Sequence, residues 1–206
     1  MTDFSNHFLI AMPSIDNVFF ESSVIYITNH SAYDGAIGVI INKPLGTISN
    51  VLLTDQMQNK KHIRTQIASS TDTANESTNL YYNINNHSST LYLGGPTHPD
   101  KNFILHRPIK KYLKSKIHQF ELSNNKDLNH KDFKAEDNFF IAAGYSSWKI
   151  LQLETEIKYN DWLVLNTKDS NSLIFDVSPD DRYQEAMRLL GINNISSLYF
   201  KETIEV

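Results

Sequence analysis

The chain has 206 residues, of which 40% are hydrophobic and 20% are charged, and its formal net charge is −4. A chain of this length can bury a core without disulfide bonds. It contains no cysteine, which excludes disulfide frameworks, thiolate catalysis and cysteine-ligated metal sites.

Three strands are expected near the start, at residues 8–12, 23–28 and 36–41, because these runs are rich in apolar and β-branched residues. Asp34-Gly35 favours a turn, so the second and third strands should form a hairpin. The second and third runs are apolar at nearly every position, which predicts strands buried on both faces beneath helices. A short helix is predicted over residues 47–56.

Residues 58–89 are dominated by Asn, Ser, Thr and Lys and contain neither Gly nor Pro. Few apolar side chains are available there to offset the entropy of ordering the chain. The flanking parts need each other to complete a core. We therefore predict one domain over residues 1–206 that carries this segment as a polar, mobile insert.

Further strands are predicted at 91–93, 102–106, 117–122, 138–144, 162–165 and 173–175. Apolar residues recur at helical spacing within 149–158, which predicts an amphipathic helix. A final helix should have Ser178 as its N-cap and end at Gly191. Strands with intervening helices, but without regular alternation, indicate an α+β fold.

Six of the seven glycines lie at the ends of predicted strands or inside them: Gly35, Gly38, Gly46, Gly94, Gly95 and Gly144. Such glycines either form ordinary tight turns or let backbones approach closely enough to line one crevice. The sequence Gly94-Gly95-Pro96 matches neither phosphate-loop pattern. Proline also lacks the N–H that an anion would need, so phosphate binding at this turn is not expected.

A predicted strand, the residues Gly144-Tyr145-Ser146-Ser147 and a predicted helix follow one another in the order of a nucleophile elbow. The elbow pattern needs glycine at position 148, where this chain has Trp148. Serine is also a favourable N-cap, and Ser147 precedes the predicted helix. Capping by Ser147 is the preferred interpretation, and a nucleophilic Ser146 is the alternative.

The eight histidines form neither an HxxxH nor an HExxH pattern, so no metal site is predicted. His30, His98 and His106 lie near strand ends and could converge. His106 is either a partly buried structural residue or a proton carrier. Residues 101–118 contain six basic residues and no acid, which is typical of a solvated loop but could also attract anions.

Several segments occur in a fixed order along almost the whole chain: HFLIAMP (7–13), SSVIY (22–26), GAIGVIINKPL (35–45), LGGP (93–96), FILH (103–106) and AGYSSW (143–148), followed by matching residues between 152 and 163. In these segments the chain resembles the YqgE/AlgH family of bacterial proteins. The resemblance implies a bent, branched, mostly antiparallel sheet that includes a small closed barrel and is surrounded by helices. It implies no single activity, although some members carry the label of transcriptional regulator. The family pattern has Ala-Gly-Trp where Ser146-Ser147-Trp148 stand here, so the resemblance implies no nucleophilic serine.

The matched segments end at predicted strand ends, where binding sites tend to form. We therefore predict a crevice lined by Asn42, Pro44, Gly94, Gly95, Pro96, His106, Gly144, Tyr145, Trp148, Gln152 and Glu154. No cofactor is expected. The start of the chain has no basic segment followed by a long apolar run, and no run approaches about 20 apolar residues, so we expect a cytoplasmic protein without a membrane anchor.

We expect a regulatory protein that binds a protein partner or a small ligand and influences transcription indirectly. Direct DNA binding is not expected, because the net charge is negative and no basic recognition helix is found. One alternative is an enzyme acting on a small polar or anionic substrate, with His106 as proton carrier and Asn42 or Glu154 as orienting residues. Another is an assembly protein that uses the 58–89 segment as a contact arm.

Overall fold

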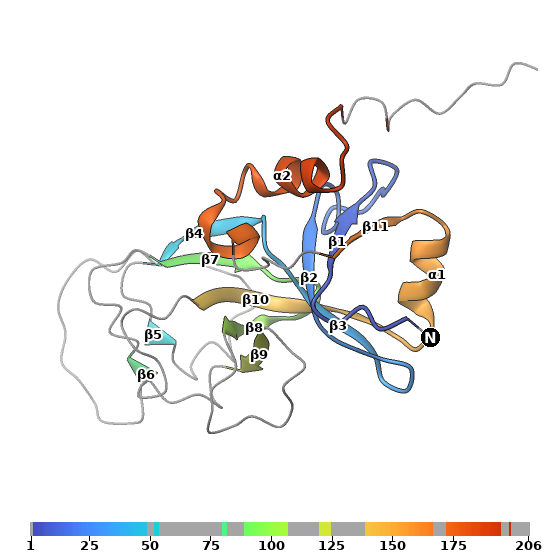
Figure 1. Cartoon of the computed structure of the whole chain (residues 1–206). Coiled ribbons are helices and arrows are strands. Elements are labelled where there is room, and N and C mark those ends of the chain that lie inside the picture. Colours follow the sequence, from blue (N-terminus) through green and yellow to red (C-terminus); the bar gives the residue numbers. More distant parts are fainter. Residues whose placement is uncertain are drawn as a thin grey trace, which may run out of the picture.

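The computed structural model describes residues 2–48, 52–53, 80–81, 89–106, 120–124, 139–166, 172–194 and 198. Its strands are β1 (Phe8–Ala11), β2 (Val24–Ser31), β3 (Gly35–Ile40), β4 (Pro44–Ile48), β5 (Leu52–Leu53), β6 (Leu80–Tyr81), β7 (Ser89–Leu93), β8 (Thr97–His106), β9 (Glu121–Asn124), β10 (Phe139–Trp148) and β11 (Trp162–Leu165). Its helices are α1 (Gln152–Lys158), α2 (Arg182–Leu189) and a π-helical turn at Ser172–Asp176. Figure 1 shows their arrangement.

The strands form a mixed sheet with few helices, as expected for an α+β fold. The strand order is β11-β1-β2-β3-β10-β7-β4, with β8 paired to both β10 and β9, while β5 and β6 form a separate pair. Among the described pairings, only that between β7 and β10 is parallel. The closed barrel, the full surround of helices and the single domain over 1–206 stay predictions.

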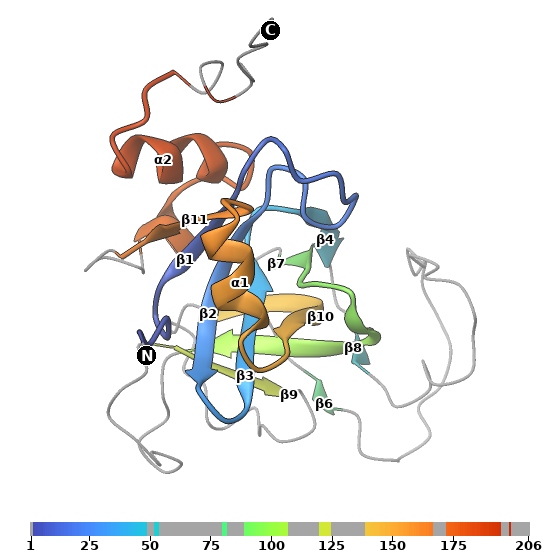
Figure 2. The same cartoon turned by 90° about the vertical axis from the view of Figure 1, so that its right-hand side faces the viewer.

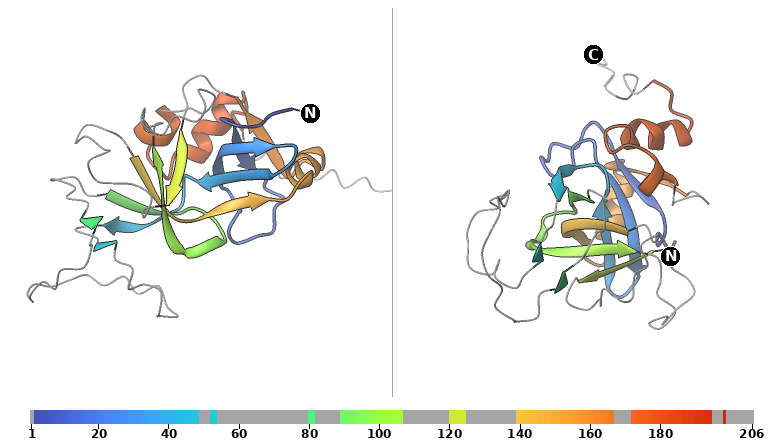
Figure 3. Two further views of the ribbon diagram at one scale, coloured as in Figure 1. Left: turned by 90° about the horizontal axis from the view of Figure 1, so that it is seen from below. Right: turned by 90° about the vertical axis from the view of Figure 1, so that its left-hand side faces the viewer.

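The long strand β10 is the branch point of the sheet. Its first half pairs with β8 and β7, and its last three residues pair with β3 instead. The register against β8 shifts between Ala143 and Tyr145, on either side of Gly144. Gly144 has φ +70°, and a Cβ there would lie 2.5 Å from the Gly95 carbonyl oxygen. Only glycine fits this bend without strain, and Figure 3 shows β10 running on from β7 and β8 to β3.

The sheet formed by β1, β2 and β3 is buried on both faces, as the apolar runs predict. Alternate side chains of β1 point to opposite faces, because the period of a strand is two. Phe8 and Ile10 belong to the cluster that includes Met187 of α2. Leu9 belongs to the cluster that includes Leu153 of α1. The two helices therefore bury opposite faces, and Figure 2 shows α1 lying against the strands of this half.

Two of the predicted elements are wrong. Residues 47–56 contain no described helix, because β4 and β5 occupy Pro44–Ile48 and Leu52–Leu53, and β4 pairs with β7. Long-range pairing here overrides local helix propensity. Residues 173–175 are not a strand but part of the π-helical turn, whose Leu173 and Ile174 are buried in the core.

The final helix is shorter at its start than predicted. Its N-cap is Asp181, and the Ser178 hydroxyl donates to the Asp181 carboxylate at 2.6 Å instead of capping the helix itself. Gly191 ends the helix as predicted, with φ +82°. The Gly191 and Ile192 N–H groups donate back to Arg188 and Met187, which is the hydrogen-bond pattern of a Schellman motif.

Two predictions concern segments that lie largely outside the described residues. Of the predicted insert at 58–89, only Leu80, Tyr81 and Ser89 are described, so its mobility stays a prediction. The basic run at 101–118 lies outside the described residues beyond His106. Within the described part of the chain, no helix is long and apolar enough to cross a membrane.

Candidate functional site

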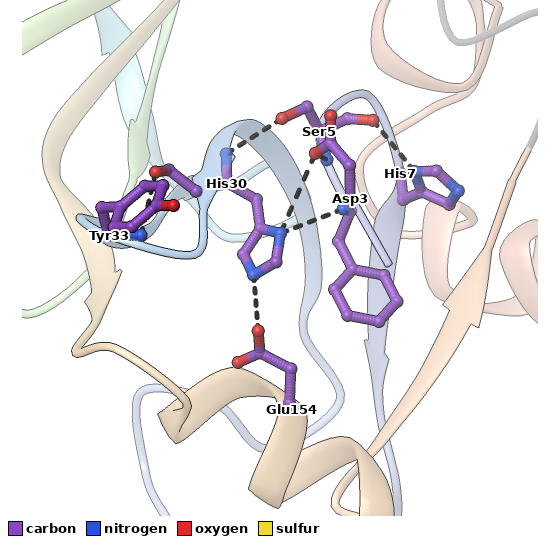
Figure 4. A network of polar contacts seen from close by, with 8 residues as sticks. Asp3, Ser5, His7, His30, Tyr33 and Glu154 are labelled. Atoms are coloured by element: carbon purple, nitrogen blue, oxygen red, sulfur yellow. Dashed lines mark hydrogen bonds and ion pairs between the residues drawn. The ribbon is translucent and has the colours of Figure 1, made fainter. Parts of the chain in front are cut away.

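The end of β2 and the helix α1 are joined by a buried polar pair. His30 lies on β2, and its Nε2 is 3.0 Å from Oε1 of Glu154 on α1. The His30 side chain is only 3% exposed, whereas that of Glu154 is 24% exposed. Figure 4 shows the imidazole between the N-terminal segment and α1. The pair therefore ties β2 to α1 across one corner of the sheet.

The N-terminal segment closes over the other side of the same imidazole. The Phe4 N–H donates to His30 Nδ1 at 3.2 Å, and the His30 N–H donates to the Ser5 hydroxyl at 2.9 Å. Because Nδ1 accepts a hydrogen bond, the ring proton of the neutral imidazole lies on Nε2 and is donated to Glu154. The Asp3 carboxylate is 3.8 Å from Nδ1 and is mostly exposed. Both ring nitrogens are thus occupied by protein groups.

A second carboxylate on α1 joins three elements. Glu156 Oε2 accepts from the indole N–H of Trp148 at 2.7 Å and from that of Trp162 at 2.8 Å. Its Oε1 accepts from the Gln152 side chain at 2.9 Å. Phe20 packs against both indole rings. The carboxylate fixes the end of β10 and the start of β11 against α1.

The residues predicted to line one crevice lie in separate places. Trp148, Gln152 and Glu154 lie beside α1, and the junction of β3, β4, β7 and β10 contains Asn42, Pro44, Gly94, Gly95, Pro96, Gly144 and Tyr145. His106 pairs with Phe139 at the opposite end of β10 from Trp148. Nine strand residues at about 3.3 Å each give a path of about 30 Å along β10 between these two ends. His106 and Trp148 are therefore not brought together.

At the junction, the matched residues serve packing between backbones. The Asn42 amide accepts from the Val24 N–H and donates to the Ser22 carbonyl, both at 2.8 Å. A Cβ on Gly94 would lie 2.2 Å from the Gly144 carbonyl oxygen. Gly94 thus allows β7 to approach β10 closely, as expected for a glycine at the end of a strand.

Both interpretations of the serines after Gly144 are wrong. Ser146 and Ser147 lie within β10, which continues to Trp148, so no strand-to-helix elbow is formed. Ser146 is fully buried and donates to the Gly94 carbonyl at 3.3 Å. The N-cap of α1 is Leu151, not Ser147.

The three histidines that could converge have different partners. His30 pairs with Ala36 of β3, which in turn pairs with Trp148, so it lies at the opposite end of β10 from His106. His106 is 2% exposed, and its Nε2 is 2.9 Å from the Ser123 hydroxyl. His98 lies against the ring of Tyr145. No group of three His, Asp or Glu side chains in the described ranges is placed to hold a metal ion.

Exposed apolar side chains lie at the two turns beside the His30–Glu154 pair. We call this set the hairpin corner: Tyr33 in the β2–β3 turn, and Ile150 and Leu151 before α1. Ile37 pairs with Ser147, and a Cβ on Gly35 would lie 3.1 Å from the Ile150 nitrogen, so the turns are adjacent. Tyr33 is 86% exposed, and Ile150 and Leu151 are each 54% exposed.

Leu151 has an unusual backbone for a branched apolar residue. Its φ is +63°, and its side chain makes no capping hydrogen bond to α1. The left-handed region costs a non-glycine residue about 1–2 kcal/mol. Sequence reasoning missed both this residue and His30 as the partner of Glu154, because 124 positions separate the pair and no local pattern connects them.

Comparison with known proteins agrees with this architecture. Residues 8–195 match the family described as AlgH-like. The chain is 36% identical over 197 residues to a UPF0301 protein of Shewanella baltica, with 94% of each chain covered. It is 33% identical over 195 residues to a UPF0301 protein of Shewanella oneidensis, with 93% of each covered.

Two solved structures share the fold. The solution structure of the AlgH protein from Pseudomonas aeruginosa is 26% identical with a TM-score of 0.64, and the match covers 100% of this chain and 95% of that one. A crystal structure of a protein from Corynebacterium diphtheriae is 18% identical with a TM-score of 0.59, covering 94% and 93%, and shows the fold alone. From the family match and the identity to these relatives, the chain belongs to the AlgH-like family.

Proposed function

We propose that this protein is a regulatory binding protein of the cytoplasm, that a protein partner docks on the hairpin corner, and that any effect on transcription is indirect. The observation that carries the proposal is Leu151, an exposed leucine in a left-handed conformation. Strained residues cluster at functional sites, where a less strained sequence would lose the function. Adjacent exposed apolar residues are also typical of protein interaction sites.

The polar groups beneath the corner favour binding over proton transfer. Both nitrogens of His30 are engaged by Phe4 and Glu154, and the ring is nearly inaccessible. A general base must reach the proton it abstracts. The imidazole instead supports the surface above it, because it fixes the distance between the β2–β3 turn and α1.

The test compares Leu151→Asn with Val18→Asn, a control at another exposed apolar position. Asparagine tolerates the left-handed region better than leucine, so Leu151→Asn should fold at least as stably as the wild type. Each protein is crosslinked in the cytosol of the source organism, and the recovered proteins are quantified by mass spectrometry. A partner recovered with wild type and Val18→Asn, but depleted at least about tenfold with Leu151→Asn, is the expected result, because a few buried apolar residues dominate most interfaces.

The same recovery from all three proteins would refute docking at this corner. A salt-dependent mobility shift of duplex DNA with the purified protein would contradict the indirect role in transcription, because direct DNA binding weakens with salt.

A further inference from the structure

Arg182, the first residue of α2, is a buried cation with only neutral partners. The residue is buried, with only 3% of its surface exposed. Its Nε donates to the Val177 carbonyl at 3.0 Å, and its Nη1 donates to the Ile41 carbonyl. Its guanidinium carbon lies 5.3 Å from the ring centre of Tyr92 and 5.8 Å from that of Phe140. No carboxylate in the described part of the chain pairs with it.

Such an arrangement is costly without a counter-charge. Burying an ion is unfavourable unless charge or several hydrogen bonds compensate it. The two carbonyls and the stacked rings of Tyr92 and Phe140, whose centroids are 3.9 Å apart, compensate in part. Burial lowers the pKa of Arg182, yet an arginine keeps its charge at neutral pH.

A guanidinium has five N–H groups. The two carbonyls account for two of them, and the guanidinium also lies beside the Tyr92 side chain, so further N–H groups are available to another acceptor.

A cavity of about 190 Å³ lies against this guanidinium. It is lined by Arg182 and Tyr92, by the hydroxyl-bearing Thr90 and by the aromatic residues Phe140 and Phe175. Pockets for drug-sized ligands measure roughly 300–1,000 Å³, so this cavity suits a smaller ligand. A guanidinium matches the two oxygens of a carboxylate or phosphate group as a bidentate donor.

We propose that the cavity between β7, β10, the π-helical turn and α2 binds a small oxyanion, a carboxylate or phosphate group held by Arg182 and by the Thr90 hydroxyl. Three acids, Asp176, Asp180 and Asp181, lie near Arg182 along the chain, but they are exposed and make no bond to it. Solvent and salt screen such exposed charges. They nevertheless disfavour polyanions, so the ligand is a single small group and not a nucleic acid.

The experiment titrates the full-length protein with inorganic phosphate and, separately, with acetate. The readout is the saturable change in amide NMR shifts at Thr90, Ile141 and Ile174, which line the cavity. A direct readout is needed because phosphate also stabilises proteins in general through exclusion from their surfaces. Saturation with phosphate alone identifies a phosphate site, with acetate alone a carboxylate site, and with both a general oxyanion site.

Arg182→Gln should weaken binding by about tenfold or more, because the bidentate charged donor is lost. Arg188→Gln is the matched control, since Arg188 lies on the same helix with an exposed side chain, and it should bind as the wild type does. Thr90→Val keeps the size of the side chain and removes the second proposed donor, so it should bind more weakly even if Arg182→Gln fails to fold.

Two results would overturn the proposal. One is the absence of saturable shifts with either anion in the wild type. The other is unchanged affinity in folded Arg182→Gln, or in Thr90→Val where Arg182→Gln does not fold. Neither result bears on docking at the hairpin corner, which is tested by different residues on the other side of the sheet.

Discussion

Replacing Glu156 should separate the contribution of one carboxylate from that of the surrounding core. Its Oε2 accepts hydrogen bonds from two indoles, those of Trp148 and Trp162, which are 5% and 3% exposed. Glu156→Ala leaves both indole N–H groups without their acceptor. Each buried donor that loses its partner costs about 1–3 kcal/mol. Because Glu156 is itself only half-buried, water can replace part of the loss, so we expect a total of about 2–4 kcal/mol.

Glu156→Gln provides an intermediate case. The amide keeps one carbonyl oxygen that can accept from an indole, but the bonds are no longer charge-assisted, so about 1–2 kcal/mol should be lost. Lys158→Ala is the control on the same helix, because Lys158 is exposed. A surface change of this kind should stay within about 0.5 kcal/mol.

The assay is equilibrium unfolding in urea, followed by intrinsic fluorescence. The chain contains two tryptophans, and both bond to Glu156, so the emission of the folded state reports on this cluster directly. The expected order of stability is Lys158→Ala, then Glu156→Gln, then Glu156→Ala. A loss below about 1 kcal/mol in Glu156→Ala, with unchanged emission from the folded protein, would refute the reasoning, since an orphaned buried donor should cost at least that much.

Other predictions test the branch point, the core and the polar pair. Gly144→Ala should cost about 3 kcal/mol or more in urea unfolding, because the new Cβ meets the Gly95 backbone at a positive φ; Gly191→Ala, also at positive φ but with nothing within 4 Å, should cost only about 1 kcal/mol. Burial raises the pKa of the Tyr26 hydroxyl. Its contribution is therefore complete below the unfolded pKa near 10 and is lost as the pH rises from there towards the folded pKa; urea unfolding between pH 9 and about 11 should show a smaller alkaline loss in Tyr26→Phe. His30→Gln should speed hydrogen exchange of the N-terminal amides, because one of them donates to the imidazole; unchanged exchange would show that the segment is held by other contacts.

The strands were predictable where apolar residues at successive positions indicate that both faces of the strand are buried. The runs at 8–12, 23–28 and 36–41 are apolar on both faces, and the structure places helices on both sides of them. The errors at 47–56 and 173–175 have one cause. Their local patterns are consistent with a helix and a strand, but the outcome depends on whether a distant strand is available to pair, as β7 is for β4.

The candidate site was predictable only in part, because its interactions are long-range. The pattern after Trp148 indicated Glu154 and Gln152, and both make side-chain hydrogen bonds at α1. Nothing local indicated that His30 would meet Glu154. Arg182 was concealed for another reason: its neighbours Asp180 and Asp181 suggest a solvated helix start, whereas its burial depends on Tyr92 from β7 and on a carbonyl after β3.

The two proposed sites are connected by one strand, β3. The hairpin corner adjoins its first residue, Gly35, and the carbonyl of Ile41, just past its end, accepts from Arg182. Six strand residues span about 20 Å, and changes so far apart without shared partners usually add independently. Leu151→Asn and Arg182→Gln should therefore have additive effects on stability. If oxyanion binding also altered partner recovery, β3 and the Ile41 carbonyl would have to adopt two arrangements, because coupling between sites requires an element whose equilibrium both ligands bias.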